Sequence, residues 1–436
     1  MSNDRIRRNP LDGLLAGCAP APQPPERLRL TSSPLLASLG RAGTSHVYLD
    51  TADVEELRAV AVADDRALSE IDGNTVNQPL VRRVLPGYAS GRAVRACADT
   101  LRGRQSGLAD VELAACLYTA VCGWIGGDVV RRVGGDRRWD VSLQLHMGVV
   151  DTAPALATRL GHCLRAIVPS CLVKVPFRPQ VPHTLLIARD LQRAGIPVNF
   201  TSTFSTRQAV AGGLLANVAR TNIFMGRLNQ GLQADLLGEH VVLEAQRAIQ
   251  RLRRSGRLAT QLIVASMRDW QTFVRVAGCD AFTAPANVLR EFLRQPDVTP
   301  DALASRLATS YADEMRVAGP VGETLGAERL ARLWRLEREF VDFLLDYGTS
   351  TEYRNLTDGE ALRRRFEAEG FGDFFYAPTA AEWSELRRNK LPDVHAPLTS
   401  RLALDTLYSL LADADFEKEQ ELIDAEILAR RHAAAA

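Results

Sequence analysis

From about residue 46 to residue 300, short apolar runs alternate with longer amphipathic segments. The runs are brief and often β-branched, and polar positions bound them, which is typical of buried strands. They predict eight strands, at residues 47–50, 70–74 (a weak one), 141–145, 171–175, 197–204, 222–226, 262–266 and 281–283. The segments between them carry the helical period, as at residues 53–63, 153–166, 183–194, 206–219 and 269–277.

Eight strands alternating with helices over this length predict an α/β protein, specifically a (β/α)8 TIM barrel. A doubly wound open sheet gives the same alternation, but no glycine-rich phosphate fingerprint follows the first strand, where Leu49-Asp-Thr-Ala-Asp53 stands instead. The barrel is therefore favoured. We expect three parts: a flexible N-terminal tail (1–25) ending in the proline-rich run 19–25, the barrel (26–300), and a C-terminal helical extension (301–436) packed on it. Helices are predicted there at 303–315, 326–345 and 405–428.

Composition narrows the classes of partner. The 53 basic residues balance 52 acidic ones, which argues against nucleic acid and anionic membranes as partners. Seven scattered cysteines and seven dispersed histidines offer no ligand spacing, so neither a disulfide framework nor a metal is expected. Residues 5–18 superficially resemble a lipoprotein signal, but the apolar run is too short, and no stretch approaches the roughly 18 uninterrupted apolar residues of a membrane span. We expect a cytoplasmic protein.

Polar residues stand at the end of nearly every predicted strand. In a TIM barrel the chemistry lies where the strands end and the following loops begin, so these side chains are expected to converge. They are Asp50, Asn77 in the loop after the second strand, Gln144, Lys174, Asn199 with Thr201, Asn222 with Arg227, Ser266 with Arg268, and Thr283.

Lys174 is the most informative of them. Only three of the 53 basic residues are lysine, and this one lies within the apolar strand Leu172-Val-Lys-Val-Pro176. A buried lysine loses its proton more easily than arginine does, and its free amine can condense with a carbonyl. A lysine that snorkels from a strand edge or pairs with Asp50 fits the spacing equally well. Arg227, Ser266 and Arg268 are a candidate phosphate clamp, with ordinary surface ion pairs as the alternative.

These motifs, in order, resemble those of transaldolase. The similarity covers residues 46–293 and rests on Tyr48-Leu-Asp-Thr-Ala52, Thr75-Val-Asn77, Leu172-Val-Lys-Val-Pro176, Gly195-Ile-Pro-Val-Asn-Phe-Thr201, Phe224-Met-Gly-Arg227 and Ala265-Ser-Met-Arg268. The resemblance implies a class I aldolase-type barrel in which Lys174 forms a Schiff base with a ketose phosphate. It further implies that Asp50 and Asn77 stabilise the donor and assist proton transfer, that Asn199 and Thr201 line the site, and that Arg227, Ser266 and Arg268 hold the phosphate.

The sequence departs from the family pattern in the sugar pocket. Gln144 stands where the family has its catalytic glutamate, and a glutamine can hold a water but cannot act as a base. Fructose-6-phosphate aldolases carry glutamine there together with a tyrosine, whereas Phe224 is the transaldolase residue and favours transfer. Asn222 replaces a serine. His146 is a candidate replacement base, with a packed or solvent-facing histidine as the alternative reading.

The resemblance thus implies a transferase that moves a three-carbon ketol unit from a phosphorylated ketose to an aldehyde, without a cofactor. The alternatives are a lyase like fructose-6-phosphate aldolase, or a non-catalytic homologue that binds sugar phosphate or a partner protein. A homodimer is a candidate assembly.

Overall fold

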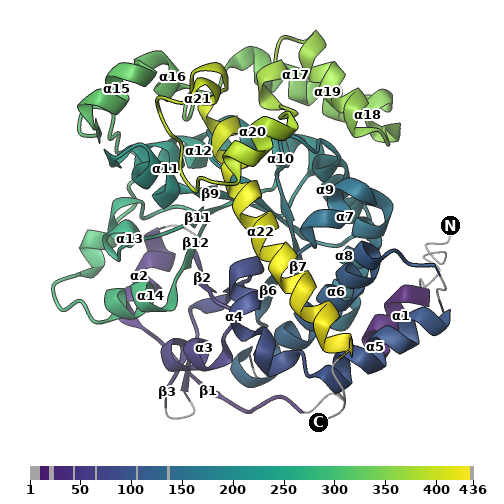
Figure 1. Cartoon of the computed structure of the whole chain (residues 1–436). Coiled ribbons are helices and arrows are strands. Elements are labelled where there is room, and N and C mark those ends of the chain that lie inside the picture. The colour runs from purple at the N-terminus through teal and green to yellow at the C-terminus, as the bar shows by residue number, and fades with distance from the viewer. Residues whose placement is uncertain are drawn as a thin grey trace.

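The computed structural model describes residues 10–18, 24–42, 45–63, 66–104, 107–134 and 138–432. Eight parallel strands close into a barrel, in which each strand pairs with its neighbours in chain order and the last pairs with the first (Figure 1). They are β2 (His46–Asp50), β5 (Ile71–Thr75), β6 (Asp140–Gln144), β7 (Cys171–Pro176), β8 (Val198–Thr203), β9 (Arg220–Phe224), β11 (Gln261–Ala265) and β12 (Ala281–Ala284). The predicted TIM barrel is confirmed, and the open sheet is excluded.

All eight predicted strands exist, and the largest error lies at the sixth. The strand predicted at 222–226 is β9, which ends at Phe224 because helix α11 (Met225–Gly231) begins at the next residue. Arg227 therefore lies in the first turn of a helix rather than in a loop. Among the predicted helices, 206–219 is α10 (Thr206–Ala216), which stops early because Asn217 adopts a left-handed conformation with φ of 51°.

The pairing register decides which side chains share the barrel interior. Lys174 on β7 lies opposite Gln144 on β6 and Asn199 on β8, and Asp50 on β2 lies opposite Thr75 on β5. Opposed residues of parallel strands point to the same face, and the alternation continues along each strand. The same inward set therefore includes Thr201, Asn222, Phe224 and Thr283.

Helices surround the barrel as the alternation predicts. The ring contains α3 (Val54–Ala61), α4 (Gln78–Tyr88), α5 (Gly91–Arg104), α6 (Asp110–Val129) continuing as η1 (Val130–Gly134), α7 (Met147–Thr152), α8 (Pro154–Ile167), α9 (His183–Arg193), α10, α11, α12 (Leu237–Arg254), α13 (Gln271–Arg275) and α14 (Ala286–Leu293). Residues 110–134 are long and apolar enough to span a membrane, but 83% of the apolar window is buried inside the protein, as in a core helix.

The N-terminal segment differs from the expected flexible tail. Within the residues described there, Pro10–Gly17 form helix α1, which packs on α8 and buries Leu11, Leu14 and Leu15. Next come α2 (Pro34–Ala42) and a small sheet of β1 (Arg29–Thr31), β3 (Val62–Ala63) and β4 (Arg66–Leu68). Residues 1–9 and most of the proline-rich run, 19–23, lie outside the described residues.

The C-terminal extension is helical, but one of its three predicted helices does not form and a second is interrupted. Residues 303–315 are mostly irregular, because Arg247 on α12 donates hydrogen bonds of 2.9 Å to the carbonyls of Leu307 and Thr309 and so fixes a non-helical backbone. The helix predicted at 326–345 is interrupted between α16 (Ala327–Ala331) and α17 (Arg338–Thr349), where the Leu333 carbonyl accepts from the backbone N–H of Thr206 at 2.9 Å. The remaining elements are η2 (Pro300–Leu303), β13 (Arg316–Val317), which pairs with β10 (Ala234–Asp235), α15 (Gly319–Leu325), α18 (Thr351–Asn355), α19 (Gly359–Ala368), η3 (Gly372–Phe374), α20 (Ala380–Leu386) and α21 (Pro397–Arg401).

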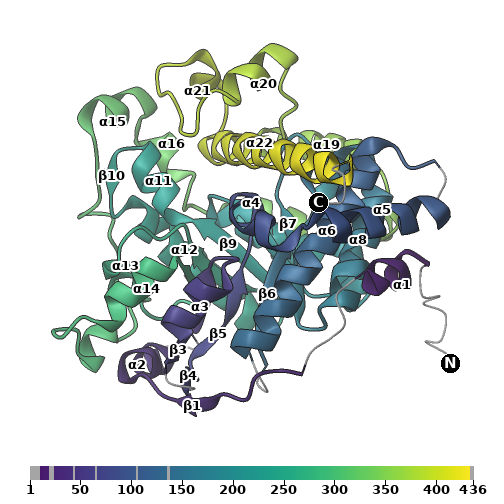
Figure 2. The same cartoon turned by 60° about the horizontal axis from the view of Figure 1, so that its bottom comes forward.

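The third predicted helix, at 405–428, is confirmed as α22 (Leu404–His432), the longest helix of the described residues. It runs diagonally across the barrel in Figure 1, and Figure 2 shows it lying over one end of the strands. Its contacts with the loops that follow β5 to β9 show that this end is the carboxyl end of the barrel, where the candidate site residues lie.

Candidate active site

Lys174 projects from the middle of β7 into the barrel and is only 3% exposed. Burial in the apolar wall lowers the pKa of its amine, and the negative charge of Asp50 partly opposes that shift. Among the described residues, no side chain forms a hydrogen bond or an ion pair with its Nζ atom. A buried, unpaired amine with a lowered pKa is the state in which lysine is nucleophilic.

Asp50 ends β2 and is held by neighbouring strands. The Thr75 hydroxyl donates to its Oδ1 at 2.7 Å, and the hydroxyls of Thr75 and Thr283 are also 2.7 Å apart. The side chains come from β5, β2 and β12, which adjoin in the barrel. This network orients a half-buried carboxylate within electrostatic range of Lys174 without a direct ion pair between the two.

Four amide and hydroxyl side chains from the next strands add buried polar atoms that lack a partner among the described residues. These atoms are Oε1 of Gln144, Oδ1 of Asn199, Oγ1 of Thr201 and Oδ1 of Asn222. The amide nitrogens are partly engaged: Asn199 donates to Ser142 Oγ at 3.0 Å, and Gln144 contacts Met147 Sδ at 3.6 Å. Buried polar atoms are ordinarily paired, so this group is suited to a hydroxylated ligand or to ordered water.

The candidate phosphate clamp is assembled only in part. Arg227 Nη2 donates to Asp415 Oδ2 of α22 at 2.8 Å, while its Nη1 is buried without a partner. Arg268 forms no hydrogen bond or ion pair among the described residues. Its pKa is lowered by burial and by the nearby Arg227, and raised by Asp50, so all three charges lie within electrostatic range. Ser266 directly follows β11 and has a left-handed conformation with φ of 63°.

Phe224 faces the barrel interior and is packed between two other aromatic rings. Its ring is T-shaped against Phe204, with centroids 5.5 Å apart, and against Phe416 of α22 at 6.3 Å. It is 7% exposed and forms an apolar wall beside the first turn of α11.

Asn77 and His146 act in the structure as helix caps. Asn77 Oδ1 accepts from the backbone N–H of Leu80 at 3.2 Å, which caps α4. His146 lies beyond the end of β6, so the period of two along the strand does not place it inside the barrel. Its Nδ1 accepts from the backbone N–H of Gly148 at 3.1 Å, which leaves the proton on Nε2, 2.9 Å from Asp424. The idea that His146 replaces the missing base is therefore not supported by its geometry.

Helix α22 closes the carboxyl end of the barrel, and sequence reasoning missed this role. Its barrel-facing residues recur every three or four positions, and together they contact the ends of the five strands β5 to β9 or the segments that follow them: Asp405, Ser409, Asp413, Phe416, Gln420 and Asp424. The Arg178–Asp413 ion pair, at 2.8 Å, is 2% and 0% exposed at its two side chains. The helical spacing of these residues was the available signal, but a polar stripe of that kind ordinarily predicts a solvated face.

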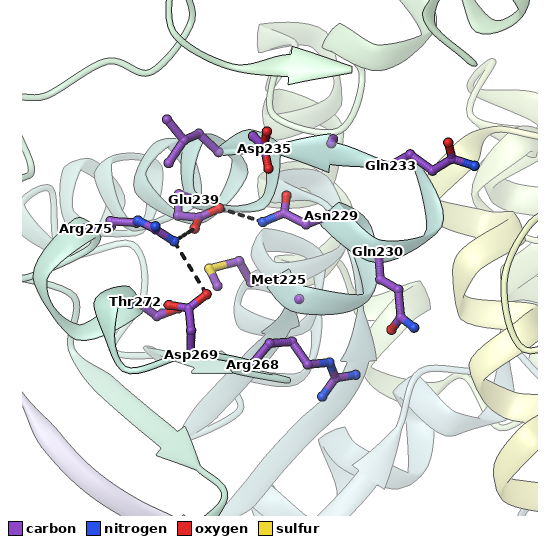
Figure 3. Close-up of a pocket in the computed structure, with 13 residues that line it drawn as sticks. Met225, Asn229, Gln230, Gln233, Asp235, Glu239, Arg268, Asp269, Thr272 and Arg275 are labelled. Carbon is purple, nitrogen blue, oxygen red and sulfur yellow. Dashed lines mark hydrogen bonds and ion pairs between the residues drawn. The ribbon is translucent and has the colours of Figure 1, made fainter. Parts of the chain in front are cut away.

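A cavity of about 710 Å³ opens beside α22, between α11, α12 and the loop before α13. Figure 3 shows Glu239, Asn229 and Arg275 joined on one of its sides, while the guanidinium of Arg268 points away from that cluster. Its lining includes the clamp residue Arg268 and also Gly226, which lies against Ser266 and Arg268. The cavity therefore borders the candidate site. Among the described residues, no group of three or more His, Cys, Asp or Glu is placed to hold a metal ion.

Comparison with known proteins identifies relatives of one kind. Residues 47–324 match the family model described as transaldolase/fructose-6-phosphate aldolase. A probable transaldolase of Thermus thermophilus is 27% identical over 57% of this chain and 91% of its own length. A probable transaldolase of Desulfatibacillum aliphaticivorans is 30% identical over 37% of this chain and 70% of its own length. A transaldolase of Saccharomyces cerevisiae is 25% identical over 66% of this chain and 84% of its own length. Helix α22 lies outside the family match.

Proposed function

The chain belongs to the transaldolase/fructose-6-phosphate aldolase family, and on that basis we propose that it transfers a three-carbon ketol unit from a phosphorylated ketose to an aldehyde acceptor. The observation that carries the proposal is Lys174, a buried and unpaired amine with a lowered pKa on the fourth barrel strand in chain order. Neither the chemistry nor the residues around it call for a cofactor.

In the proposed reaction, the neutral Nζ of Lys174 attacks the ketone carbon of the donor, and the resulting carbinolamine loses water to form an iminium. Asp50 then takes the proton of the hydroxyl on the far carbon of the bond that breaks, and this carbon becomes the carbonyl carbon of the leaving aldehyde. The electron pair of the broken carbon–carbon bond forms the double bond of an enamine, while the second electron pair of the iminium double bond moves to its nitrogen. The remaining three-carbon enamine attacks the acceptor aldehyde by the reverse of these steps, and water releases the product from Lys174.

Gln144 and Thr201 are assigned a water-holding role in that sequence. Both have a buried oxygen without a partner, which suits a water that is consumed and released at the Schiff base. Since an amide does not ionise near neutrality, the only barrel-interior carboxylate near Lys174 among the assigned residues is Asp50, and the proposed relay depends on it.

The phosphate is assigned to Arg268, Arg227 and Ser266, with Asn77, Asn199 and Asn222 around the hydroxyls. Arg268 supports this because its charge lies near both Arg227 and Asp50 and no described residue forms an ion pair with it. The cavity beside Arg268 is the proposed path of entry, since α22 covers the barrel axis.

Transfer is favoured over simple cleavage. Phe224 supports it, because an apolar ring has no hydroxyl with which to help release the bound three-carbon fragment. A purely binding role is disfavoured by the joint presence of Lys174, Asp50, Arg227 and Arg268 in one barrel mouth. The expected cytoplasmic location and the homodimer stay predictions.

A product analysis tests the proposal. The protein is incubated with fructose 6-phosphate, with and without erythrose 4-phosphate, and the products are separated by chromatography. Transfer predicts sedoheptulose 7-phosphate only when the acceptor is present. Free dihydroxyacetone formed at equal rates without acceptor would identify a lyase, and no consumption of any ketose phosphate would contradict the proposal.

A further inference from the structure

The Arg227 clamp already holds an anion that belongs to the protein itself. Asp415 of α22 accepts from Arg227 Nη2 at 2.8 Å, and its other oxygen lies 3.2 Å from the Lys390 amine. The side chains of Asp415 and Arg227 are 9% and 17% exposed, respectively. The Arg227 guanidinium also lies over the ring of Phe416, 5.7 Å from its centroid, which fixes it beside α22.

Helix α22 is anchored too firmly to withdraw Asp415 when a substrate arrives. The Arg178–Asp413 pair lies two residues before Asp415 and is fully buried, and Asp405 is held by both Arg207, at 2.7 Å, and the Ser205 hydroxyl, at 2.6 Å. Lifting the helix would leave these charges unpaired and expose apolar side chains, which is strongly unfavourable. Asp415 is therefore a fixed part of the site.

A fixed carboxylate on Arg227 changes what the clamp binds. A phosphate dianion placed there either displaces Asp415 from the guanidinium or lies next to a like charge, and both weaken its binding. An uncharged hydroxyl meets neither penalty, and the buried Nη1 of Arg227 is still free to donate to it.

We infer that Asp415 is a specificity-determining residue that reduces the preference of the Lys174 site for a phosphorylated over an unphosphorylated ketose. The predicted change in substrate preference rests on the proposed function. The predicted effect of Asp415 on phosphate binding does not depend on turnover.

The test compares the whole chain with two variants that convert a carboxylate of α22 to its amide. Asp415→Asn removes the charge at Arg227. Glu419→Gln is the matched control, because Glu419 lies on the same helix but pairs with the surface residue Arg82, at 3.0 Å. Calorimetry gives the Kd for inorganic phosphate and for fructose 6-phosphate. Steady-state kinetics give kcat/KM for fructose 6-phosphate and for fructose.

Asp415→Asn is expected to tighten phosphate binding about fivefold and to raise the ratio of kcat/KM for fructose 6-phosphate over fructose by a similar factor, mainly through KM. Glu419→Gln leaves the Kd and the ratio unchanged. In an Arg227→Gln background the effect of Asp415→Asn is lost, since the charge acts through that guanidinium.

A Kd for inorganic phosphate that is unchanged or larger in Asp415→Asn would overturn the inference. An equal tightening of phosphate binding by Asp415→Asn in the Arg227→Gln background would overturn it as well. A gain in phosphate binding together with no turnover of any ketose would instead uphold the role of Asp415 and contradict the proposed function.

Discussion

The barrel interior and helix α22 meet at one surface, yet they differ in what holds their polar groups. Inside the barrel, the buried oxygens of Gln144, Asn199 and Thr201 have no hydrogen-bond partner among the described residues. Along α22, the barrel-facing carboxylates each form an ion pair, as Asp413 does with Arg178 and Asp405 with Arg207, although Oδ1 of Asp413 and the hydroxyl of Tyr408 are buried without a hydrogen-bond partner among the described residues. Unpaired groups in one region and paired groups in the other separate a site prepared for a ligand from the scaffold that encloses it.

Arg227 lies on the boundary between these regions. It comes from a barrel strand-end helix, but its partner is Asp415 of α22. The comparison teaches that the element which closes the barrel also changes the charge that a substrate meets there. The predictions below separate the chemical role of the interior from the enclosing role of α22.

The largest expected effect is on activity and comes from the interior. Lys174→Met lowers turnover on the order of 10³-fold or more, because no Schiff base can form, while the fold is retained since the replacement is apolar. Steady-state assays together with the thermal unfolding midpoint check this. Lys174→Arg is the control that keeps the charge and is equally inactive. Residual activity within tenfold of the unaltered chain would assign the chemistry to another residue.

The second effect is on stability and comes from α22. Asp413→Ala lowers the free energy of unfolding by about 3 kcal/mol, because it leaves the buried Arg178 without its closest charge partner. Glu419→Ala, which breaks a surface pair on the same helix, changes it by less than about 1 kcal/mol. Denaturant unfolding measures both. Equal small losses would mean that α22 is not anchored through Arg178.

The third effect concerns the missing base. Gln144→Glu raises turnover about tenfold, because a carboxylate there, with a pKa raised by burial, can relay the proton through the water held with Thr201. Gln144→Met, similar in size but unable to hold the water, lowers turnover. Unchanged or slower turnover in Gln144→Glu would show that the relay does not use this position.

The smallest effect is a shift in pH dependence. The rate of iminium formation rises as Lys174 loses its proton, and burial lowers the pKa of Lys174, so that this rise comes below the ordinary pKa of 10.5. Asp50 raises the pKa of Lys174, so Asp50→Asn moves the midpoint to lower pH. Trapping with cyanoborohydride across a pH series measures the midpoint. A shift to higher pH would contradict the assigned electrostatics.

The interior could be predicted from the sequence far better than α22 could. The ends of strands can be recognised from local sequence, because Asp50, Gln144 and Lys174 each follow a short apolar run. The alternation of side chains along each strand then allows all three to face the barrel interior. The position of α22 depends on contacts between residues more than 200 apart, such as Arg178 with Asp413. Its helix was predicted, but the pattern of Asp405, Ser409 and Asp413 is equally typical of a solvated face.

The same limit explains two other errors. The irregular backbone around Leu307 is fixed by Arg247, and the break at Leu333 by the start of α10; neither partner is near in sequence. The error at His146 has a local cause. Its spacing from Gln144 continues the period of the strand, but β6 ends at Gln144 and the His146 ring caps the next helix.

The central claim is that Lys174 is the amine that binds a ketose covalently. Its most direct measurement is reduction with borohydride in the presence of fructose 6-phosphate or sedoheptulose 7-phosphate, followed by peptide mass spectrometry. The account predicts one adduct, on the peptide that contains Lys174, with Lys390 and Lys418 unmodified. An intact Lys174 peptide with every ketose phosphate tried, or an adduct on Lys390 or Lys418 instead, would contradict it.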